Sequence, residues 1–108
     1  MNLIDLDKNS DGETVRLQTG DHLVISLAET PTTGYRWAVD ALDADSLEQD
    51  ESEFGLTSPH GVGGGGVRRL VFVAKKASST RLALKLLREW EGDKSIINRF
   101  SVTVTVTD

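Results

Sequence analysis

Two histidines, with the serines and carboxylates around them, are the residues of this sequence that could support catalysis. His22 stands at the start of an alternating segment, and His60 follows Ser58 and Pro59 in a glycine-rich stretch. A nucleophilic serine needs a histidine base that a third group orients. Nothing near either histidine supplies that arrangement, and the chain has no cysteine to act as a thiolate. The sequence therefore does not predict an enzyme.

Metal binding is the second kind of chemistry to test. Two histidines without cysteine argue against a transition-metal site. Residues 7–12, Asp-Lys-Asn-Ser-Asp-Gly, match the first half of an EF-hand calcium loop. However, Gln18 stands where that loop needs a bidentate glutamate, and Thr14–Leu17 alternates like a strand instead of a helix. We predict a hairpin turn with Asp11-Gly12 at its tip, with calcium as the alternative, and no cofactor.

A glycine-rich run, Gly-Val-Gly-Gly-Gly-Gly, occupies residues 61–66 and satisfies the pattern G-x-G-x-x-G. A dinucleotide loop of this kind needs a strand before it and a helix after it. Here residues 67–70 begin a strand and no Walker lysine follows, so the context argues against phosphate binding. Two interpretations stay open. The run is a flexible linker, or it is a backbone that lies close to a partner's surface.

Two other stretches have the composition of binding loops. In residues 30–35, Thr-Pro-Thr-Thr-Gly-Tyr, proline and glycine favour a turn and two threonines occupy its tip. Residues 88–92, Arg-Glu-Trp-Glu-Gly, place an arginine and a tryptophan at the end of a strand. Such residues are typical of binding hot spots, worth about 2 kcal/mol each when a partner buries them. The alternative for the tryptophan is a ring folded back to cap the core.

Strands must position these stretches, because two-residue alternation is the strongest pattern in the chain. Phe100, Val102, Val104 and Val106 alternate with serine and threonines, which indicates a half-buried strand. The same pattern marks residues 3–6, 14–17, 22–28, 35–39, 70–74 and 82–86. About seven short strands predict a sandwich or a barrel, and Trp37 in a middle strand favours an immunoglobulin-like β-sandwich.

One region lacks this alternation. Residues 43–53 carry six acidic side chains, with only Ala44 and Leu47 apolar. We predict a solvated helical turn and loop here, leading to a weak strand near Phe54–Thr57. The predicted fold is therefore all-β with a short acidic helical turn or loop. The region is interpreted as an exposed connection, with an acidic docking patch as the alternative.

Length and charge limit what the chain can do. Its 108 residues fit a single domain, 1–108, whose core needs no disulfide or metal. A net charge of -5 repels nucleic acid, and no apolar run approaches the roughly 20 residues that cross a membrane. We expect a monomer. The localisation stays open: cytoplasmic if Met1 is the native start, periplasmic or secreted if a signal peptide was removed.

Taken together, the three loop stretches resemble the chagasin family, protein inhibitors of papain-like cysteine peptidases. The family's N-P-T-T-G-[YF]-x-W, G-x-G-G and R-P-W are similar to residues 30–37, 61–64 and 88–90, in the same order. The resemblance implies a reversible, non-covalent inhibitor that occludes the peptidase's active-site cleft with three loops. The peptidase-binding residues it implies are Thr30, Pro31, Thr32, Thr33, Gly34, Gly61, Val62, Gly63, Gly64, Arg88 and Trp90.

Some residues depart from the family pattern. Thr30 stands in place of asparagine and Glu89 in place of proline, and Gly65 and Gly66 leave the register of the middle loop open. These departures bear on potency and target range more than on fold. The alternative function is an immunoglobulin-like binding or adhesion module that uses the same loops for a non-peptidase partner. Inhibition assays separate the two hypotheses.

Overall fold

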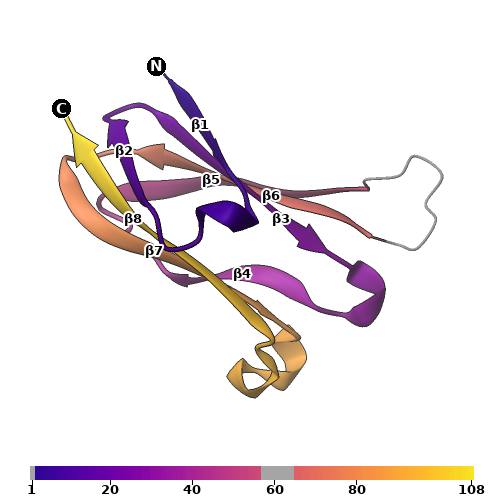
Figure 1. The fold of residues 1–108 in the computed structure, drawn as a ribbon. Helices are drawn as coiled ribbons and strands as arrows, with labels where there is room; N and C mark the ends of the chain where they lie inside the picture. The colour runs from indigo at the N-terminus through magenta and orange to yellow at the C-terminus, as the bar shows by residue number, and fades with distance from the viewer. Residues whose placement is uncertain (1, 57–64) are drawn as a thin grey trace.

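The structure is a computed structural model that describes residues 2–56 and 65–108, in which eight strands form two four-stranded sheets (Figure 1). The strand orders are β1-β3-β6-β5 and β2-β8-β7-β4. The strands are β1 (Leu3–Leu6), β2 (Thr14–Gln18), β3 (His22–Glu29), β4 (Arg36–Ala41), β5 (Leu47–Leu56), β6 (Gly66–Ala74), β7 (Ser78–Leu87) and β8 (Asn98–Thr107). The predicted all-β, immunoglobulin-like sandwich is confirmed, with eight strands where about seven were expected.

The alternating side chains meet between the two sheets and form the core. Leu23 and Ile25 from β3 and Phe72 from β6 are fully buried in one sheet, and Leu84 and Phe100 face them from the other. Each such side chain stabilises the fold by about 1.5–3 kcal/mol relative to an exposed one. The strands that alternate most regularly in the sequence are therefore the ones that hold the two layers together.

The first two strands lie in different sheets, so the predicted hairpin is wrong. β1 runs parallel to β3, and β2 runs parallel to β8. The link between them contains a short 3-10 turn, η1 (Lys8–Ser10), which the Asp7 carboxylate caps by accepting the Asn9 N–H at 2.8 Å. The Asp11 carboxylate accepts the Ser101 N–H at 2.8 Å. Both carboxylates of the calcium-like motif therefore hold backbone amides.

The acidic region is mostly strand, which corrects the predicted helical turn and loop. A turn over residues 44–46 leads directly into β5, whose residues 48–53 are all exposed. Among the described strands, β5 pairs only with β6 and forms an edge of its sheet. Acidic side chains along an edge strand oppose pairing with another chain. The alternation is missing because this edge strand is solvated on both faces.

The strand register brings the ends of strands from both sheets to one end of the sandwich (Figure 1). At the end of one sheet, Glu29 of β3 lies opposite Gly66 of β6. At the same end of the other sheet, Arg36 of β4 lies opposite Leu87 of β7. At this end β3, β5 and β7 end and β4, β6 and β8 begin, whereas the start of β1 and the end of β8 lie at the far end.

Candidate functional site

The β3–β4 connection, called here the threonine loop (residues 30–35), is a turn fixed by its own hydrogen bonds. Its centre is a 3-10 turn, η2 (Pro31–Thr33). Thr33 donates to the Thr30 carbonyl twice, from its N–H at 3.1 Å and from its hydroxyl at 2.6 Å, and its hydroxyl accepts the Tyr35 N–H at 3.4 Å. Thr33 therefore shapes the turn. Among the described residues, no side chain or backbone group is bonded to the hydroxyl of exposed Thr32.

Gly34 allows an aromatic ring to lie directly against the threonine loop. Its φ of 82° is in the left-handed region that favours glycine, and a Cβ at this position would overlap the ring of Trp90. Trp90 belongs to a short 3-10 turn, η4 (Glu89–Glu91), and is 73% exposed. The alternative that this tryptophan folds back to cap the core is therefore wrong. Its ring covers Gly34 and presents its remaining surface to solvent.

Arg88 connects the threonine loop to the β7–β8 connection. Its Nε donates to the Thr33 carbonyl at 3.0 Å, and its guanidinium lies 4.5 Å from the centroid of the Tyr35 ring. One of its terminal nitrogens also pairs with the Glu91 carboxylate at 3.2 Å. Arg88 therefore has a role inside the protein, where it holds two loops together. Its predicted contact with a peptidase stays a prediction.

The β7–β8 connection, called here the tryptophan loop (residues 88–97), is tied together by one serine. The hydroxyl of Ser95, which is 8% exposed, accepts the Arg88 N–H at 2.9 Å and donates to the Gly92 carbonyl at 2.7 Å. Ser95 ends a second 3-10 turn, η5 (Asp93–Ser95), that follows η4. Sequence reasoning missed this residue, because a single serine in a polar loop carries no sign of burial.

Trp37 closes the base of the threonine loop from the core side. It is 5% exposed, its indole N–H donates to the Ala28 carbonyl at 2.9 Å, and its backbone N–H donates to the Glu29 carboxylate at 2.8 Å. The two residues before the loop are thus bonded to the second residue after it. Trp37 therefore anchors the threonine loop from the core. Sequence reasoning did not single out Glu29.

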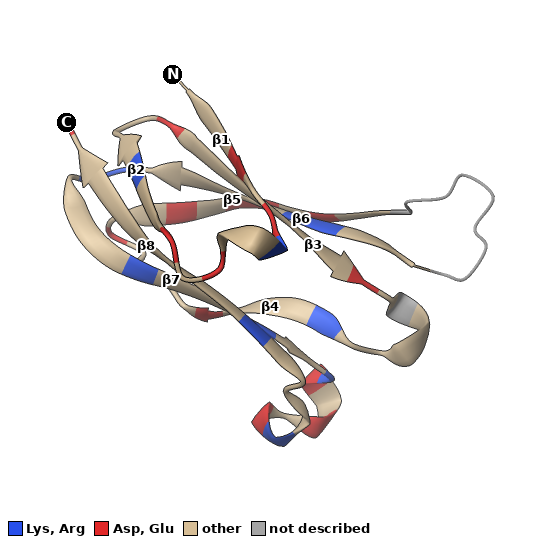
Figure 2. Cartoon of the chain, viewed as in Figure 1, with Lys and Arg blue, Asp and Glu red and all other residues tan. Residues whose placement is uncertain are grey.

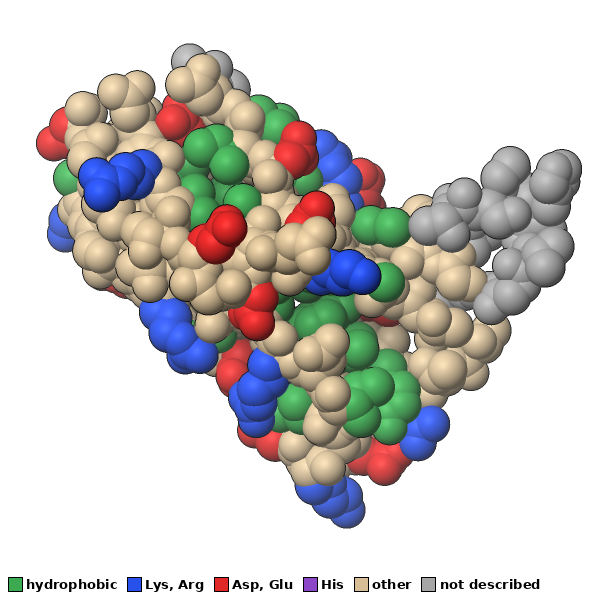
Figure 3. Space-filling model, in the orientation of Figure 1, with side chains coloured by type: hydrophobic (Ala, Val, Ile, Leu, Met, Phe, Trp, Pro, Cys, Tyr) green, Lys and Arg blue, Asp and Glu red, His purple; other side chains and the backbone are tan. Residues whose placement is uncertain are grey.

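Positions of basic and of acidic residues both occur on the elements that carry the site (Figure 2). Arg36 and Glu89 approach to 3.9 Å, and together with Gly34 and Trp90 they line an open depression of about 250 Å³. Figure 3 shows hydrophobic side chains on the surface at this end of the molecule, next to charged ones. An apolar ring beside mixed charges is a surface that suits a protein partner.

An ion pair fixes the outer turn of the tryptophan loop to β7. Lys85 donates to the Asp93 carboxylate at 2.8 Å and lies 3.6 Å from Asp40. The hydrogen bond from Lys85 lowers the pKa of Asp93 below its usual value, and the same bond raises the pKa of Lys85. Both groups therefore stay charged over a wide pH range, and the loop keeps this attachment.

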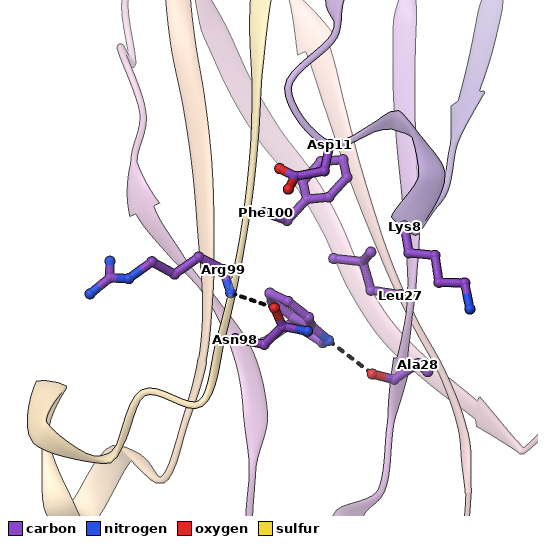
Figure 4. A pocket seen from close by; sticks show the side chains of 8 residues that line it. Lys8, Asp11, Leu27, Ala28, Asn98, Arg99 and Phe100 are labelled. Atoms are coloured by element: carbon purple, nitrogen blue, oxygen red, sulfur yellow. Dashed lines mark hydrogen bonds between the residues drawn. The ribbon is translucent and has the colours of Figure 1, made fainter.

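A cavity of about 160 Å³ lies beside Trp37, between the two sheets (Figure 4). Its walls consist of Lys8, Asp11, Leu27, Ala28, Trp37, Asn98, Arg99 and Phe100. Pockets that take drug-sized ligands hold about 300–1,000 Å³, so this one is too small for such a ligand. The candidate site is therefore the set of protruding loops.

Neither a metal cluster nor a membrane helix is present in the part of the chain that the structure describes. Within residues 2–56 and 65–108, no three or more His, Cys, Asp or Glu side chains are grouped so as to hold a metal ion. Over those same residues, no helix has the length and apolar character needed to cross a bilayer.

The structure brings two of the three predicted binding stretches into contact. Thr33 and Gly34 of the threonine loop touch Arg88 and Trp90 of the tryptophan loop. Thr30 contributes its carbonyl to the turn, and Pro31 and Thr32 lie in η2. The third stretch, Gly61, Val62, Gly63 and Gly64, lies outside the described residues.

Comparison with known proteins also indicates a peptidase inhibitor. Residues 16–104, most of the chain, match the sequence model of the chagasin family peptidase inhibitors, I42. The chain is also similar to Amoebiasin-2 of Entamoeba histolytica, with 28% identity over 105 residues that cover 94% of this chain and 83% of that protein.

Solved structures share the fold. The cysteine protease inhibitor EhICP2 from Entamoeba histolytica has a TM-score of 0.89 at 23% identity, covering 99% of this chain and 97% of that one. PbICP-C, solved in complex with falcipain-2, has a TM-score of 0.69 at 16% identity, covering 99% of this chain and 100% of that one. The family match spans both described loops and the strands that carry them. The chain belongs to the chagasin family of peptidase inhibitors.

Proposed function

We propose that this protein is a reversible, non-covalent inhibitor of papain-like cysteine peptidases that occludes the active-site cleft with the loops at one end of its sandwich. The family supports inhibition of a peptidase, and PbICP-C was solved with falcipain-2. One observation carries the mode of action. The bond from Arg88 to the Thr33 carbonyl fixes the threonine loop and the tryptophan loop as one surface.

A fixed surface suits an inhibitor that works by shape. Ordering loops on binding costs about 0.5–1.5 kcal/mol for each immobilised flexible side chain. Here the turn is closed by Thr33, and its outer face is covered by Trp90 across Gly34. Most of the ordering has therefore taken place before a peptidase arrives, which favours tight binding.

The tip of the threonine loop suits a catalytic cleft because it carries no charge. Its residues are Pro31, Thr32, Thr33 and Gly34. The Thr32 hydroxyl has no partner among the described residues and is available to a donor or acceptor on the peptidase. The loop supplies no nucleophile, and the mechanism that follows is occlusion without covalent chemistry.

An inhibition assay with papain tests this function. Nanomolar to micromolar protein should inhibit papain, and activity should return on dilution because no covalent bond forms. The inhibitor should be recovered at its original mass after the assay. Full papain activity in the presence of micromolar folded protein would contradict the proposal.

A charge placed on the tip tests the cleft contact. Thr32→Asp should raise the inhibition constant at least tenfold, because a carboxylate buried in the cleft loses its hydration. Thr32 is exposed, so the thermal unfolding midpoint should change little. The matched control is Glu48→Gln, on exposed β5 and toward the far end of the sandwich, which should leave inhibition unchanged. Equal effects from the two variants would place the contact elsewhere.

A further inference from the structure

Glu29 and Arg68 form a buried ion pair directly under the threonine loop. Glu29 is 4% exposed and Arg68 is 9% exposed. A terminal nitrogen of Arg68 donates to Glu29 Oε2 at 2.7 Å, and Arg68 Nε lies 3.1 Å from Oε2 and 3.2 Å from Oε1. The two residues come from neighbouring strands, β3 and β6, at the end of the sandwich that carries the site.

The carboxylate of Glu29 also reaches across to the other sheet. Glu29 Oε1 accepts the backbone N–H of Trp37 at 2.8 Å. Trp37 lies in β4, an edge strand whose single neighbour among the described strands is β7. Its N–H points away from that neighbour, and the Glu29 side chain takes the place of a missing strand. This bond closes the base of the threonine loop between β3 and β4.

The guanidinium of Arg68 contacts β5 on its other side. A terminal nitrogen of Arg68 lies 3.5 Å from the Ser52 hydroxyl, and the guanidinium carbon of Arg68 lies 5.6 Å from the centroid of the Phe54 ring. The same ring packs so closely on Gly66 that a Cβ there would overlap it. One ion pair therefore touches β3 and β4, which carry the threonine loop, and β5 and β6, which carry the glycine-rich connection.

We propose that Glu29 and Arg68 are positioning residues for the inhibitory site, which set the place of the threonine loop relative to β5 and β6. This inference rests on the proposed function. A buried ion pair is costly to desolvate, and apolar residues of similar volume often support a fold as well or better. Apolar replacements would not accept the Trp37 N–H. They would also not supply the planar guanidinium of Arg68, which joins β6 to Glu29 of β3 and to Ser52 of β5.

A positioning role changes binding kinetics in a characteristic way. If the loop is correctly placed for only part of the time, the apparent affinity falls by that fraction. The complex itself keeps its contacts, so the loss appears in the association rate constant. Removal of a contact residue such as Trp90 acts mainly on the dissociation rate constant. The two roles are therefore separable in one experiment.

The experiment uses the double variant Glu29→Met/Arg68→Met, which removes the charges together and keeps the volume. Stopped-flow inhibition of papain should show an association rate constant lowered about tenfold, with dissociation changed less than about twofold. The thermal unfolding midpoint should fall by no more than several degrees, because the lost acceptor of the Trp37 N–H is partly offset by the removal of two buried charges. The matched control is Glu53→Gln/Arg69→Met, which removes an exposed pair, 3.2 Å apart, that joins β6 to its other neighbour, β5. The control should change neither rate.

The outcomes separate clearly. An unchanged association rate in the folded double variant overturns the proposal, and so does a loss confined to dissociation. If the double variant does not fold, Glu29→Gln decides the matter, because glutamine can still accept the Trp37 N–H at nearly the same size. A folded Glu29→Gln protein should bind more slowly than the original, and equal association rates would overturn the proposal.

A measurement without peptidase keeps the two proposals distinct. If the original protein does not inhibit papain, the proposed function fails, and hydrogen exchange decides the role of the pair. The amides of Thr33 and Trp37, both hydrogen-bonded here, should exchange faster in the double variant than in the control. Equal exchange in both proteins would show that the pair does not position the loop.

Discussion

Single residues of the site divide into those that build the surface and those that present it. Thr33 and Gly34 build it, through local hydrogen bonds and through a backbone conformation that admits a ring. Thr32 and Trp90 present it, since both are exposed. The sequence motif does not separate these roles, because it gives the order of the residues and not their partners.

Gly34→Ala should disturb both the backbone of the threonine loop and the position of the Trp90 ring. The substitution forces alanine into a φ of 82°, which costs about 1 kcal/mol, and it pushes the Trp90 ring from its place. We expect inhibition at least tenfold weaker, measured with papain, and a lower unfolding midpoint.

The matched control for this variant is Gly20→Ala at the far end of the sandwich. Gly20 has a similar φ of 95°, with no atom within 4 Å of a Cβ added there. It should show the backbone cost in its unfolding midpoint and keep full inhibition. Equal inhibition by both variants would mean that the Trp90 ring has no part in binding.

Trp90→Ala should separate binding from stability. With 73% of its surface exposed, the ring adds little to folding, so the unfolding midpoint should fall by no more than a few degrees. A central aromatic contact is worth about 2 kcal/mol, which raises the inhibition constant about 30-fold. Surface-based binding kinetics with papain would measure this. An unchanged constant would place Trp90 outside the interface.

At the scale of the elements, the tryptophan loop is a second rigid unit beside the threonine loop. Ser95 ties its start to its end, and Lys85 of β7 holds its outer turn through Asp93. Glu89, which stands where the family has proline, approaches Arg36 of β4. The loop is therefore held within itself by Ser95 and to β7 by Lys85, and the exposed Arg36–Glu89 contact adds little.

Ser95→Ala should loosen this unit. The partly buried N–H of Arg88 loses its partner and the Gly92 carbonyl keeps only the backbone N–H of Ser95, which costs about 1–3 kcal/mol of the free energy of unfolding. Urea unfolding followed by fluorescence measures the loss. Ser79→Ala, at an exposed position of β7, is the control and should stay within about 0.5 kcal/mol of the original protein. A loss of the same size from both variants would contradict the role of Ser95.

The elements also show how far sequence reasoning reaches. β3, β7 and β8 were predicted because their large core-facing side chains recur at every second position. β5 was largely missed because an edge strand solvated on both faces leaves no such record. The sheet switch between β1 and β2 was also missed, since a hairpin and a crossing use the same turn residues. Glu29 and Arg68 lie 39 residues apart, and no local pattern links them.

At the scale of the whole molecule, a buried carboxylate links the two sheets at the end opposite the site. The Asp21 carboxylate, in a residue that is 4% exposed, accepts the N–H of Asn2 at 2.9 Å and that of Gln18 at 2.8 Å. These bonds join the start of β1 to the end of β2, across the two sheets. The hydrogen bonds from the Gln18 and Asn2 amides lower the pKa of Asp21 below its ordinary 3.8.

The hydrogen-bonded Asp21 carboxylate predicts that the protein loses stability in acid. Because the folded pKa is below the unfolded one, the charged carboxylate stabilises the fold above about pH 4, and the contribution is lost as the pH falls through the folded pKa. Asp21→Asn should be less stable than the original protein at pH 7, and the difference should shrink toward pH 2. Urea unfolding midpoints across this range measure it. Asp50→Asn on exposed β5 should run parallel to the original, and a constant difference for Asp21→Asn would contradict the prediction.

Because both ends of the chain lie at the far end from the loops, attachment there leaves the loops free (Figure 1). Two copies joined end to end by a flexible linker could each hold a peptidase at once. On a surface or vesicle that carries several peptidase molecules, the second capture would be an intramolecular step at an effective concentration in the millimolar range for a short linker. Such a tandem would gain avidity without any change in the loops. The position of the termini therefore allows the residence time of the inhibitor on the peptidase to be lengthened by linkage alone.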